Sequence, residues 1–185
     1  ITGSLGVASC ARAAGATVPF LRPAALAQDA TPKLPVIEHL VQHLEQGGAV
    51  IDRIVDLQPT SPLRDSADID EALAACPDAP LTVSVREAAD NPYFNLVEPD
   101  AHGWLQLSKG LGNTRRQDAP PVYALNGSIY VWQRRALAQA ATQGLWSVQV
   151  GKYLMPRWKS VDIDDLEDFE YAEWLLHRHG GASGC

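Results

Sequence analysis

The sequence predicts an α/β domain with a mainly parallel sheet, helices on both faces and right-handed crossover connections. Segments with the periodicity of amphipathic helices alternate along the chain with short apolar segments that are typical of buried strands. Glycine or proline follows several of these segments, as expected where helices and strands end. No internal repeat is visible, and 185 residues can bury the core of one domain, so we expect a single domain over residues 1–185.

Five segments are expected to form helices. The segment 34–46 has the clearest pattern, because Leu34, Ile37 and Val41 fall on one helical face and glycine follows its last residue. A helix from residue 66 would be capped by Asp65 or Ser66, whose short polar side chains can accept a hydrogen bond from the first-turn backbone. The expected helices are 7–14, 34–46, 66–76, 134–142 and 165–179.

Four segments are expected to form strands of the sheet. In the first of them Val50, Ile54 and Val55 are apolar, although Asp52 and Arg53 interrupt the pattern. The expected strands are 49–57, 81–85, 128–132 and 148–154.

The region 91–121 differs from the rest of the chain. Aromatic and apolar residues alternate there with polar residues and turns: Pro92, Tyr93, Phe94, Trp104 and Leu107. This predicts a hairpin-like excursion from the main sheet. The tail 180–185, which follows the last expected helix, is expected to be frayed.

Composition excludes several classes of function. The formal net charge of −7 argues against a nucleic-acid surface, which needs clustered Lys and Arg. The longest apolar runs are too short to span a bilayer. Cys10, Cys76 and Cys185 have no metal-ligand spacing and are too few and scattered for a disulfide framework. We therefore expect a cytoplasmic protein with no nucleic-acid or membrane partner.

Five segments carry a resemblance to a known family. They read LQPTSPLR at 57–64, RRQDAPPVY followed by NGSIY over 115–130, SVDID at 160–164, NPYFNLVE at 91–98 and VPFLRP at 18–23. In this order and over nearly the whole chain, they resemble the acylneuraminate cytidylyltransferases, which make CMP-sugars from nine-carbon sugar acids.

The resemblance implies a fold, a reaction and partners. The fold would be the three-layer α/β/α, Rossmann-like fold of the nucleotide-diphospho-sugar transferases. The enzyme would join CTP to a nine-carbon sugar acid of the sialic, legionaminic or pseudaminic type and release pyrophosphate, with Mg²⁺ as cofactor. The resemblance further implies a homodimer, with the excursion 91–121 as its interface; the aromatic content of this region suits that role.

Asp162 and Asp164 are the candidate metal ligands and catalytic residues. They lie two residues apart, so their carboxylates would point the same way in an extended segment. Mg²⁺ commonly takes one or two carboxylates together with phosphate oxygens and water. The alternative is that Asp162 begins a turn and that Asp164 or Asp165 caps the final helix.

Gln58 and Arg116 are the candidate contacts for the sugar acid. Gln58 follows an expected strand, and ligands of open α/β sheets bind beyond the carboxyl ends of strands. Arg116 matches the family arginine that meets the substrate, and a guanidinium pairs with a carboxylate through two hydrogen bonds. Arg115 is a weaker second candidate, and Arg64 is expected to be structural. The alternatives are a turn shaped by prolines for Gln58 and a solvated basic pair for Arg116.

Asn126, Tyr130 and Trp146 complete the candidate substrate pocket by resemblance. Asn126 and Gly127 are expected just before a strand, where glycine allows a close backbone approach, although an Asn-Gly pair is more often a turn. Tyr130 could equally be a core residue of the strand. Three further cations, Lys152, Arg157 and Lys159, could meet phosphate, but a charged surface is the commoner explanation.

The sequence departs from the family at its beginning. Family members open with a strand and a Gly-, Arg- and Lys-rich loop that holds CTP, and Ile1 to Ser4 match the end of the family's second conserved strand. We therefore expect the nucleotide-binding segment to be missing and activity to be impaired. Two other hypotheses remain open: a cytidylyltransferase for a shorter sugar acid, and a non-catalytic domain that binds a sugar acid or a partner subunit.

Overall fold

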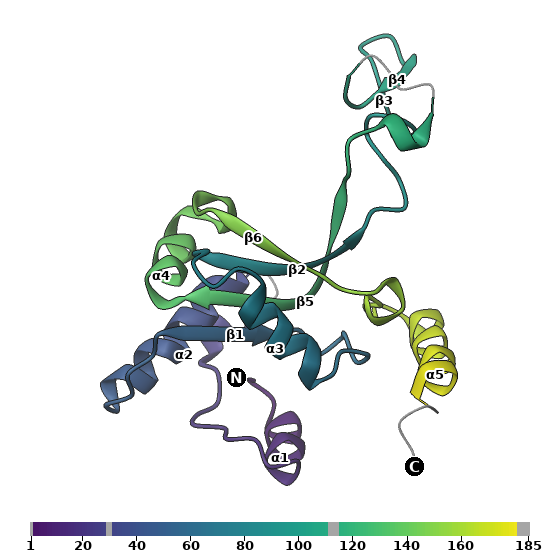
Figure 1. Cartoon of the computed structure of the whole chain (residues 1–185). Helices are drawn as coiled ribbons and strands as arrows, with labels where there is room; N and C mark the ends of the chain where they lie inside the picture. The colour runs from purple at the N-terminus through teal and green to yellow at the C-terminus, as the bar shows by residue number, and fades with distance from the viewer. Residues whose placement is uncertain (1, 29–30, 111–114, 181–185) are drawn as a thin grey trace. The chain divides into compact units, whose positions relative to one another are not determined.

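The computed structural model describes residues 2–28, 31–110 and 115–180, which form an α/β fold (Figure 1). The five expected helices are confirmed, and each of their ends lies within two residues of the expected position. They are α1 (Leu5–Ala13), α2 (Lys33–Gln46), α3 (Ser66–Ala75), α4 (Arg134–Gln143) and α5 (Leu166–Gly180). Residues 181–185 of the expected frayed tail lie outside the described residues.

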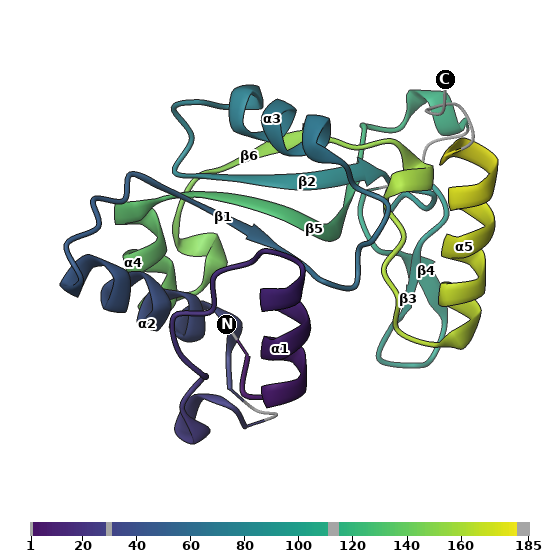
Figure 2. The same ribbon diagram turned by 90° about the horizontal axis from the view of Figure 1, so that it is seen from below.

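The main sheet has four strands in the order β1-β5-β2-β6. Its strands are β1 (Arg53–Leu57), β2 (Leu81–Glu87), β5 (Tyr123–Gln133) and β6 (Val150–Leu154). β5 runs antiparallel to β1, because Gln58 donates to the carbonyl of Ser128 while Arg134 donates to that of Asp52. It also runs antiparallel to β2, where Ala88 donates to Val122 and Gln133 to Pro80. The expected α/β class is therefore confirmed, with a sheet that is mixed (Figure 2).

The chain divides into two compact units, and the sheet strands supply residues to both. The first unit comprises Ile1–Val55, Asp78–Leu81 and Val131–Gly151, and the second comprises Asp56–Pro77, Thr82–Tyr130 and Lys152–Cys185.

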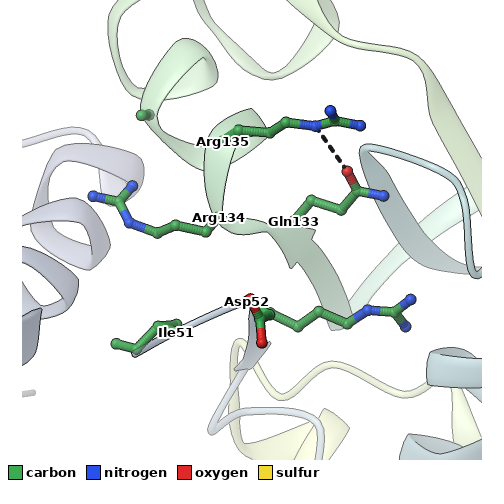
Figure 3. Close-up of a pocket in the computed structure, with 7 residues that line it drawn as sticks. Ile51, Asp52, Gln133, Arg134 and Arg135 are labelled. Carbon is green, nitrogen blue, oxygen red and sulfur yellow. Dashed lines mark hydrogen bonds between the residues drawn. The ribbon is translucent and has the colours of Figure 1, made fainter. Parts of the chain in front are cut away.

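In the first unit, α4 is joined to α2 by an ion-pair network. Arg134 donates to Glu38 at 2.9 Å and to Glu45 at 2.6 Å, and these contacts raise the pKa of Arg134. A cavity of about 600 Å³ lies beside the start of α4 (Figure 3). Its lining residues are Ile51, Asp52, Arg53, Gln133, Arg134, Arg135 and Ala138. None of the site residues expected from the sequence lines this cavity.

In the second unit, α5 packs on the segment that precedes it. Leu63, Ala172 and Leu175 form a buried cluster against which Trp158, Val161 and Ile163 pack. Packing against this cluster therefore holds residues 158–163 between α5 and the loop that contains Leu63; full burial of a leucine side chain stabilises by about 1.5–3 kcal/mol, and partial burial by less.

The expected hairpin-like excursion is confirmed as a second, two-stranded sheet. β3 (Val97–Pro99) pairs antiparallel with β4 (Leu105–Leu107), with Glu98 opposite Gln106. The side chain of Asn91 closes the base of this excursion by donating to the carbonyl of Pro120 at 2.9 Å. Residues 111–114 of the excursion lie outside the part of the chain that the structure describes.

Candidate active site

The loop after β1 is held by hydrogen bonds from the side chain of Arg64 to backbone carbonyls. One nitrogen of Arg64 donates to the carbonyls of Gln58 (2.6 Å) and Ser61 (3.0 Å) and to that of Ser128 on β5 (3.3 Å). Burial lowers the pKa of this guanidinium, and the Asp56 carboxylate offsets part of that effect. These contacts agree with the structural role expected for Arg64, which joins the loop to β5.

Gln58 and Asp162 are brought together although 104 residues separate them. The Gln58 amide nitrogen donates to the carboxylate Oδ2 of Asp162 at 2.9 Å and to the hydroxyl of Thr60 at 3.0 Å. The backbone carbonyl of Thr60 accepts from the backbone nitrogen of Ile163 at 2.9 Å. The loop after β1 and the segment before α5 are therefore joined by both side-chain and backbone contacts.

The second carboxylate oxygen of Asp162 is available for a ligand. Oδ1 is buried and has no hydrogen-bond partner among the described residues. A buried acceptor without a partner costs about 1–3 kcal/mol, and more when it is charged. Such an oxygen fits a hard divalent cation. No group of three or more His, Cys, Asp or Glu side chains that could hold a metal ion occurs within residues 2–28, 31–110 and 115–180.

Asp164 is exposed, in contrast to the half-buried Asp162. The cap of α5 is supplied by its neighbour, since Asp165 accepts a hydrogen bond from the backbone nitrogen of Asp168 at 2.9 Å. The backbone nitrogen of Asp164 donates to the Asp168 carboxylate at 3.1 Å. Of the two residues considered for the cap of this helix, Asp165 supplies it. The Asp164 carboxylate does not take part in the cap.

Asn126 and Gly127 lie inside β5, so the expectation that they precede the strand is wrong. Gly127 has a φ of +71°, which is unusual for a strand and marks a local irregularity. A Cβ atom built on Gly127 would lie 2.8 Å from the side-chain oxygen of Gln58. Glycine is therefore needed here both for its backbone conformation and for the close approach of Gln58.

The side chain of Asn126 is buried and joins three segments. Its oxygen accepts from Ser84 on β2 at 2.6 Å. Its nitrogen donates to Ser160 at 2.9 Å and to the sulfur of Met155 at 3.2 Å. Both ends of the amide thus have protein partners, which favours a role in positioning the segment 155–160 over direct contact with a ligand.

Tyr130 lies half-buried on β5 near the carboxylates of Asp56 and Asp162. Burial raises the pKa of its phenol, and the negative charges of Asp56 and Asp162 raise it further. The phenol therefore stays protonated near neutral pH.

Arg116 lies in η2 (Arg116–Asp118), exposed, and donates to the backbone carbonyl of Ala89. It lines a cavity of about 450 Å³. A neighbouring cavity of about 270 Å³ contains Asp162. Both cavities are also lined by Ala89 and Arg157, so Arg116 and Asp162 face adjoining spaces in the second unit.

Two further arginines belong to this cavity system. Arg157 lines both cavities, and Arg86 lines the one that contains Asp162. The sequence suggested Arg157 only as a lesser alternative to a charged surface, and it gave no signal for Arg86, which follows buried strand residues. Only the pairing of β2 with β6 could have indicated that both lie at the same cavity.

Lys159 fixes η4 (Arg157–Lys159) to the start of α3. Its ammonium donates to Asp65 at 2.7 Å and to the buried Asp68 at 2.8 Å. Burial alone would lower the pKa of Lys159, but these two carboxylates outweigh it and raise the pKa. Lys159 is therefore occupied within the protein, which argues against its suggested contact with phosphate.

Trp146 belongs to the first unit, unlike the other expected site residues. It lies in η3 (Leu145–Ser147), and 72% of its surface is exposed. Its place in the substrate pocket stays a prediction.

The fold has relatives among solved structures. The crystal structure of 2-C-methyl-D-erythritol 4-phosphate cytidylyltransferase from Thermus thermophilus matches 96% of this chain and 91% of its own, with a TM-score of 0.53 and 14% sequence identity. The fold is therefore that of the nucleotide-diphospho-sugar transferases, as expected from the sequence. At 14% sequence identity this likeness assigns the chain to a class of fold and not to a reaction.

Sequence comparisons narrow this class to a family. The CMP-N,N'-diacetyllegionaminic acid synthase of Campylobacter jejuni is 35% identical, and the post-translational flagellin modification protein B of Campylobacter coli is 34% identical; each match covers 95% of this chain and 74% of the relative. An N-acylneuraminate cytidylyltransferase of Streptococcus agalactiae is 29% identical over 61% of this chain and 27% of its own length. A comparison with protein-family models finds no match. The chain belongs to the acylneuraminate cytidylyltransferase family, which includes the CMP-legionaminic acid synthases.

Proposed function

We propose that this protein makes a CMP-sugar and pyrophosphate from CTP and a nine-carbon sugar acid. The anomeric hydroxyl oxygen of the sugar acid attacks the α-phosphorus of CTP and forms a new P–O bond. The bond between the α-phosphorus and the bridging oxygen breaks, and pyrophosphate leaves with the electron pair. The hydroxyl proton passes to solvent or to a nearby base.

One observation supports this proposal above the others: the buried, unpartnered oxygen of Asp162 next to a cavity lined by arginines. Phosphoryl transfer depends mainly on alignment and on neutralising phosphate charge. Asp162 and Asp164 would hold Mg²⁺, which would neutralise charge on the α-phosphate when bound. Asp162 has the oxygen for this role, and the exposed Asp164 has no competing role in the helix cap.

Arg116 is proposed to bind the carboxylate of the sugar acid, with Arg157 as a second positive charge between Arg116 and Asp162. Tyr130 and Gln58, which both lie near Asp162, are proposed as further contacts for the substrate. Cations that converge on one cavity system suit a substrate with a carboxylate and a phosphate. Asn126 is proposed to shape the pocket by positioning the segment 155–160, and the place of Trp146 in the pocket stays a prediction from the family resemblance.

The proposal extends to assembly and location. The exposed side chains of Leu96, Val97, Trp104 and Leu105 on the β3–β4 excursion support it as the interface of a homodimer. None of the described helices is long and apolar enough to cross a membrane. A cytoplasmic location is proposed because CTP is the co-substrate.

The test is pyrophosphate release with CTP, Mg²⁺ and a panel of nine-carbon sugar acids. The assay uses this chain and a chimera in which the chain replaces the matching 74% of the Campylobacter jejuni relative. Release that requires one of the acids supports the function and names the substrate. A folded chimera that releases no pyrophosphate with any acid contradicts it.

A further inference from the structure

We infer that Gln58 is a positioning residue for Asp162: its amide holds one oxygen of the Asp162 carboxylate and so leaves the other for a divalent cation. The inference rests on the proposed function, because it assumes that Asp162 holds the cation. It assigns Gln58 a task beyond the sugar contact expected from the sequence.

The two oxygens of Asp162 have different surroundings. Oδ2 accepts from the Gln58 amide nitrogen at 2.9 Å, whereas Oδ1 is buried and has no partner among the described residues. A carboxylate that rotates freely about its Cβ–Cγ bond would present its oxygens in many directions. The hydrogen bond to one oxygen favours the orientation in which the other occupies the buried position. Partners of this kind commonly orient the ligands of metal sites.

The amide of Gln58 is itself held in one orientation. Its nitrogen donates to the hydroxyl of Thr60 at 3.0 Å as well as to Asp162. A flipped amide would place its oxygen against the negatively charged carboxylate of Asp162 and would be disfavoured. The backbone of Gln58 is fixed on both sides, by donation to the Ser128 carbonyl at 3.1 Å and by acceptance from Arg64 at 2.6 Å.

Gly127 provides the space for this arrangement. An added Cβ would lie 2.8 Å from the Gln58 side-chain oxygen, 3.4 Å from its carbonyl carbon and 3.5 Å from its nitrogen. Any larger residue at this position would push the amide away from its present place, and the φ of +71° would strain it as well. Gly127 therefore acts on Asp162 through Gln58, and substitutions at the two positions should have the same effect on the cation.

The test measures Mn²⁺ binding by water-proton relaxation, with and without CTP, on the whole chain. Gln58→Met keeps the length of the side chain but removes the donor, and the backbone contacts of Gln58 do not depend on it. We expect its Mn²⁺ dissociation constant to rise on the order of 10- to 100-fold, the range found when a partner of a metal ligand is removed. Gly127→Ala should weaken Mn²⁺ binding in the same direction.

Two variants make the result interpretable. Gln42→Met is the matched control. Gln42 lies exposed on α2, and its side chain donates a hydrogen bond to Glu38, which is not a candidate site residue. It should bind Mn²⁺ as the unaltered chain does. Asp162→Asn should weaken Mn²⁺ binding at least as much as Gln58→Met.

The outcomes separate this inference from the proposed function. If Asp162→Asn weakens Mn²⁺ binding but Gln58→Met does not, the positioning role is overturned and the cation site stands. A rise in KM for the sugar acid alone, without a change in Mn²⁺ affinity, also overturns it, since Gln58 would then be only a substrate contact. If the unaltered chain binds no Mn²⁺, or if Asp162→Asn binds it equally well, the cation site itself is overturned.

Discussion

Asp162 and Asp164 are identical in residue type and similar in sequence surroundings, yet the structure gives them different environments. Asp162 is half-buried, with one oxygen bound to Gln58 and the other without a partner in the described part of the chain. Asp164 is exposed. A cation that binds both would therefore have one partly buried carboxylate and one exposed carboxylate as protein ligands.

Asp162→Asn and Asp164→Asn are each expected to remove most turnover of CTP while leaving the fold intact. An amide oxygen carries no net charge and binds Mg²⁺ more weakly than a carboxylate oxygen. The loss should be on the order of 10²–10³-fold in kcat, as when one group that stabilises charge in a transition state is removed. Pyrophosphate release measures it, and far-UV circular dichroism checks the fold.

The matched control for the aspartate variants is Asp70→Asn, at an exposed position of α3. It should retain the activity of the unaltered protein. Activity within about twofold of the unaltered protein in Asp162→Asn would contradict the metal assignment of Asp162.

Arg116→Ala is expected to raise the KM for the sugar acid and to leave the KM for CTP nearly unchanged. A hydrogen bond to a charged group is worth about 1.5–3 kcal/mol, so the rise should be on the order of 10- to 100-fold. Steady-state kinetics with each substrate varied in turn measure both constants.

Arg115→Ala is the matched control for Arg116, one residue away. The Arg115 guanidinium already pairs with Asp118 through contacts of 2.8 and 3.0 Å, so its loss should change the KM for the sugar acid little. Equal effects of the two substitutions would mean that Arg116 acts through the conformation of η2 and not through the substrate.

At the scale of elements, the sequence predicts the helices well but misplaces the starts of two strands, β1 and β5. Helical periodicity depends on residues close in the chain, so α2 was located to within one residue. β1 begins at Arg53 and not at residue 49, since the apolar Val50 is 92% exposed and apolar character alone does not mark burial. β5 begins at Tyr123, before the predicted start, because Gly127 allows the strand to continue through an irregular position.

The candidate site was predictable only in part, because its contacts join segments that are distant in sequence. Motifs identified Asp162, Gln58 and Arg116, but no local pattern showed that Gln58 would contact Asp162 across 104 positions. Arg86 gave no signal, because its relation to the cavity depends on which strands pair. Contacts between segments distant in sequence are set by tertiary packing, and periodic patterns in a single sequence report only local structure.

Lys159 connects two elements of the second unit, η4 and α3, through Asp65 and Asp68. Lys159→Met is expected to lower the free energy of unfolding by about 2 kcal/mol near neutral pH. This is less than the roughly 3–5 kcal/mol for breaking a buried pair, because Asp65 is largely exposed. Urea denaturation at a series of pH values measures the difference.

The sign of the pH dependence follows from both partners of the pair. The hydrogen bond from Lys159 lowers the pKa of Asp65. The stabilisation that Asp65 contributes is therefore present above its unfolded pKa near 3.9 and is lost as pH falls through its folded pKa. The pKa of Lys159 is raised, so its stabilisation is present below the unfolded value near 10.4 and lost as pH rises through the folded value. The effect of Lys159→Met should therefore be constant between about pH 5 and 9 and shrink below about pH 4.

Lys109→Met, on the excursion, provides the control for loss of a positive charge alone, and should change stability little. A loss in Lys159→Met that is as large at pH 3 as at pH 7 would show that Lys159 stabilises by packing of its aliphatic chain and not by its charge.

At the scale of the whole molecule, the excursion that contains β3 and β4 carries four exposed large apolar side chains, and α5 carries five among the described residues. Figure 1 shows these strands at the end of two extended segments that continue from β2 and β5. Trp104 is 75% exposed and Leu105 is 71% exposed. A two-stranded hairpin is marginally stable alone, and a second hairpin packed on these side chains would bury them and stabilise both.

Trp104→Ser combined with Leu105→Ser is therefore expected to convert the proposed dimer into a monomer. The mass of the unaltered protein in solution should be twice the protomer mass of 20.0 kDa, and that of the double variant should equal one protomer. Light scattering coupled to gel filtration measures both. Trp146→Ser is the control, since Trp146 is similarly exposed at 72% but lies in the first unit, and its mass should remain that of the dimer. If the double variant keeps the dimer mass, the interface lies elsewhere; if the unaltered protein is already a monomer, the homodimer itself is contradicted.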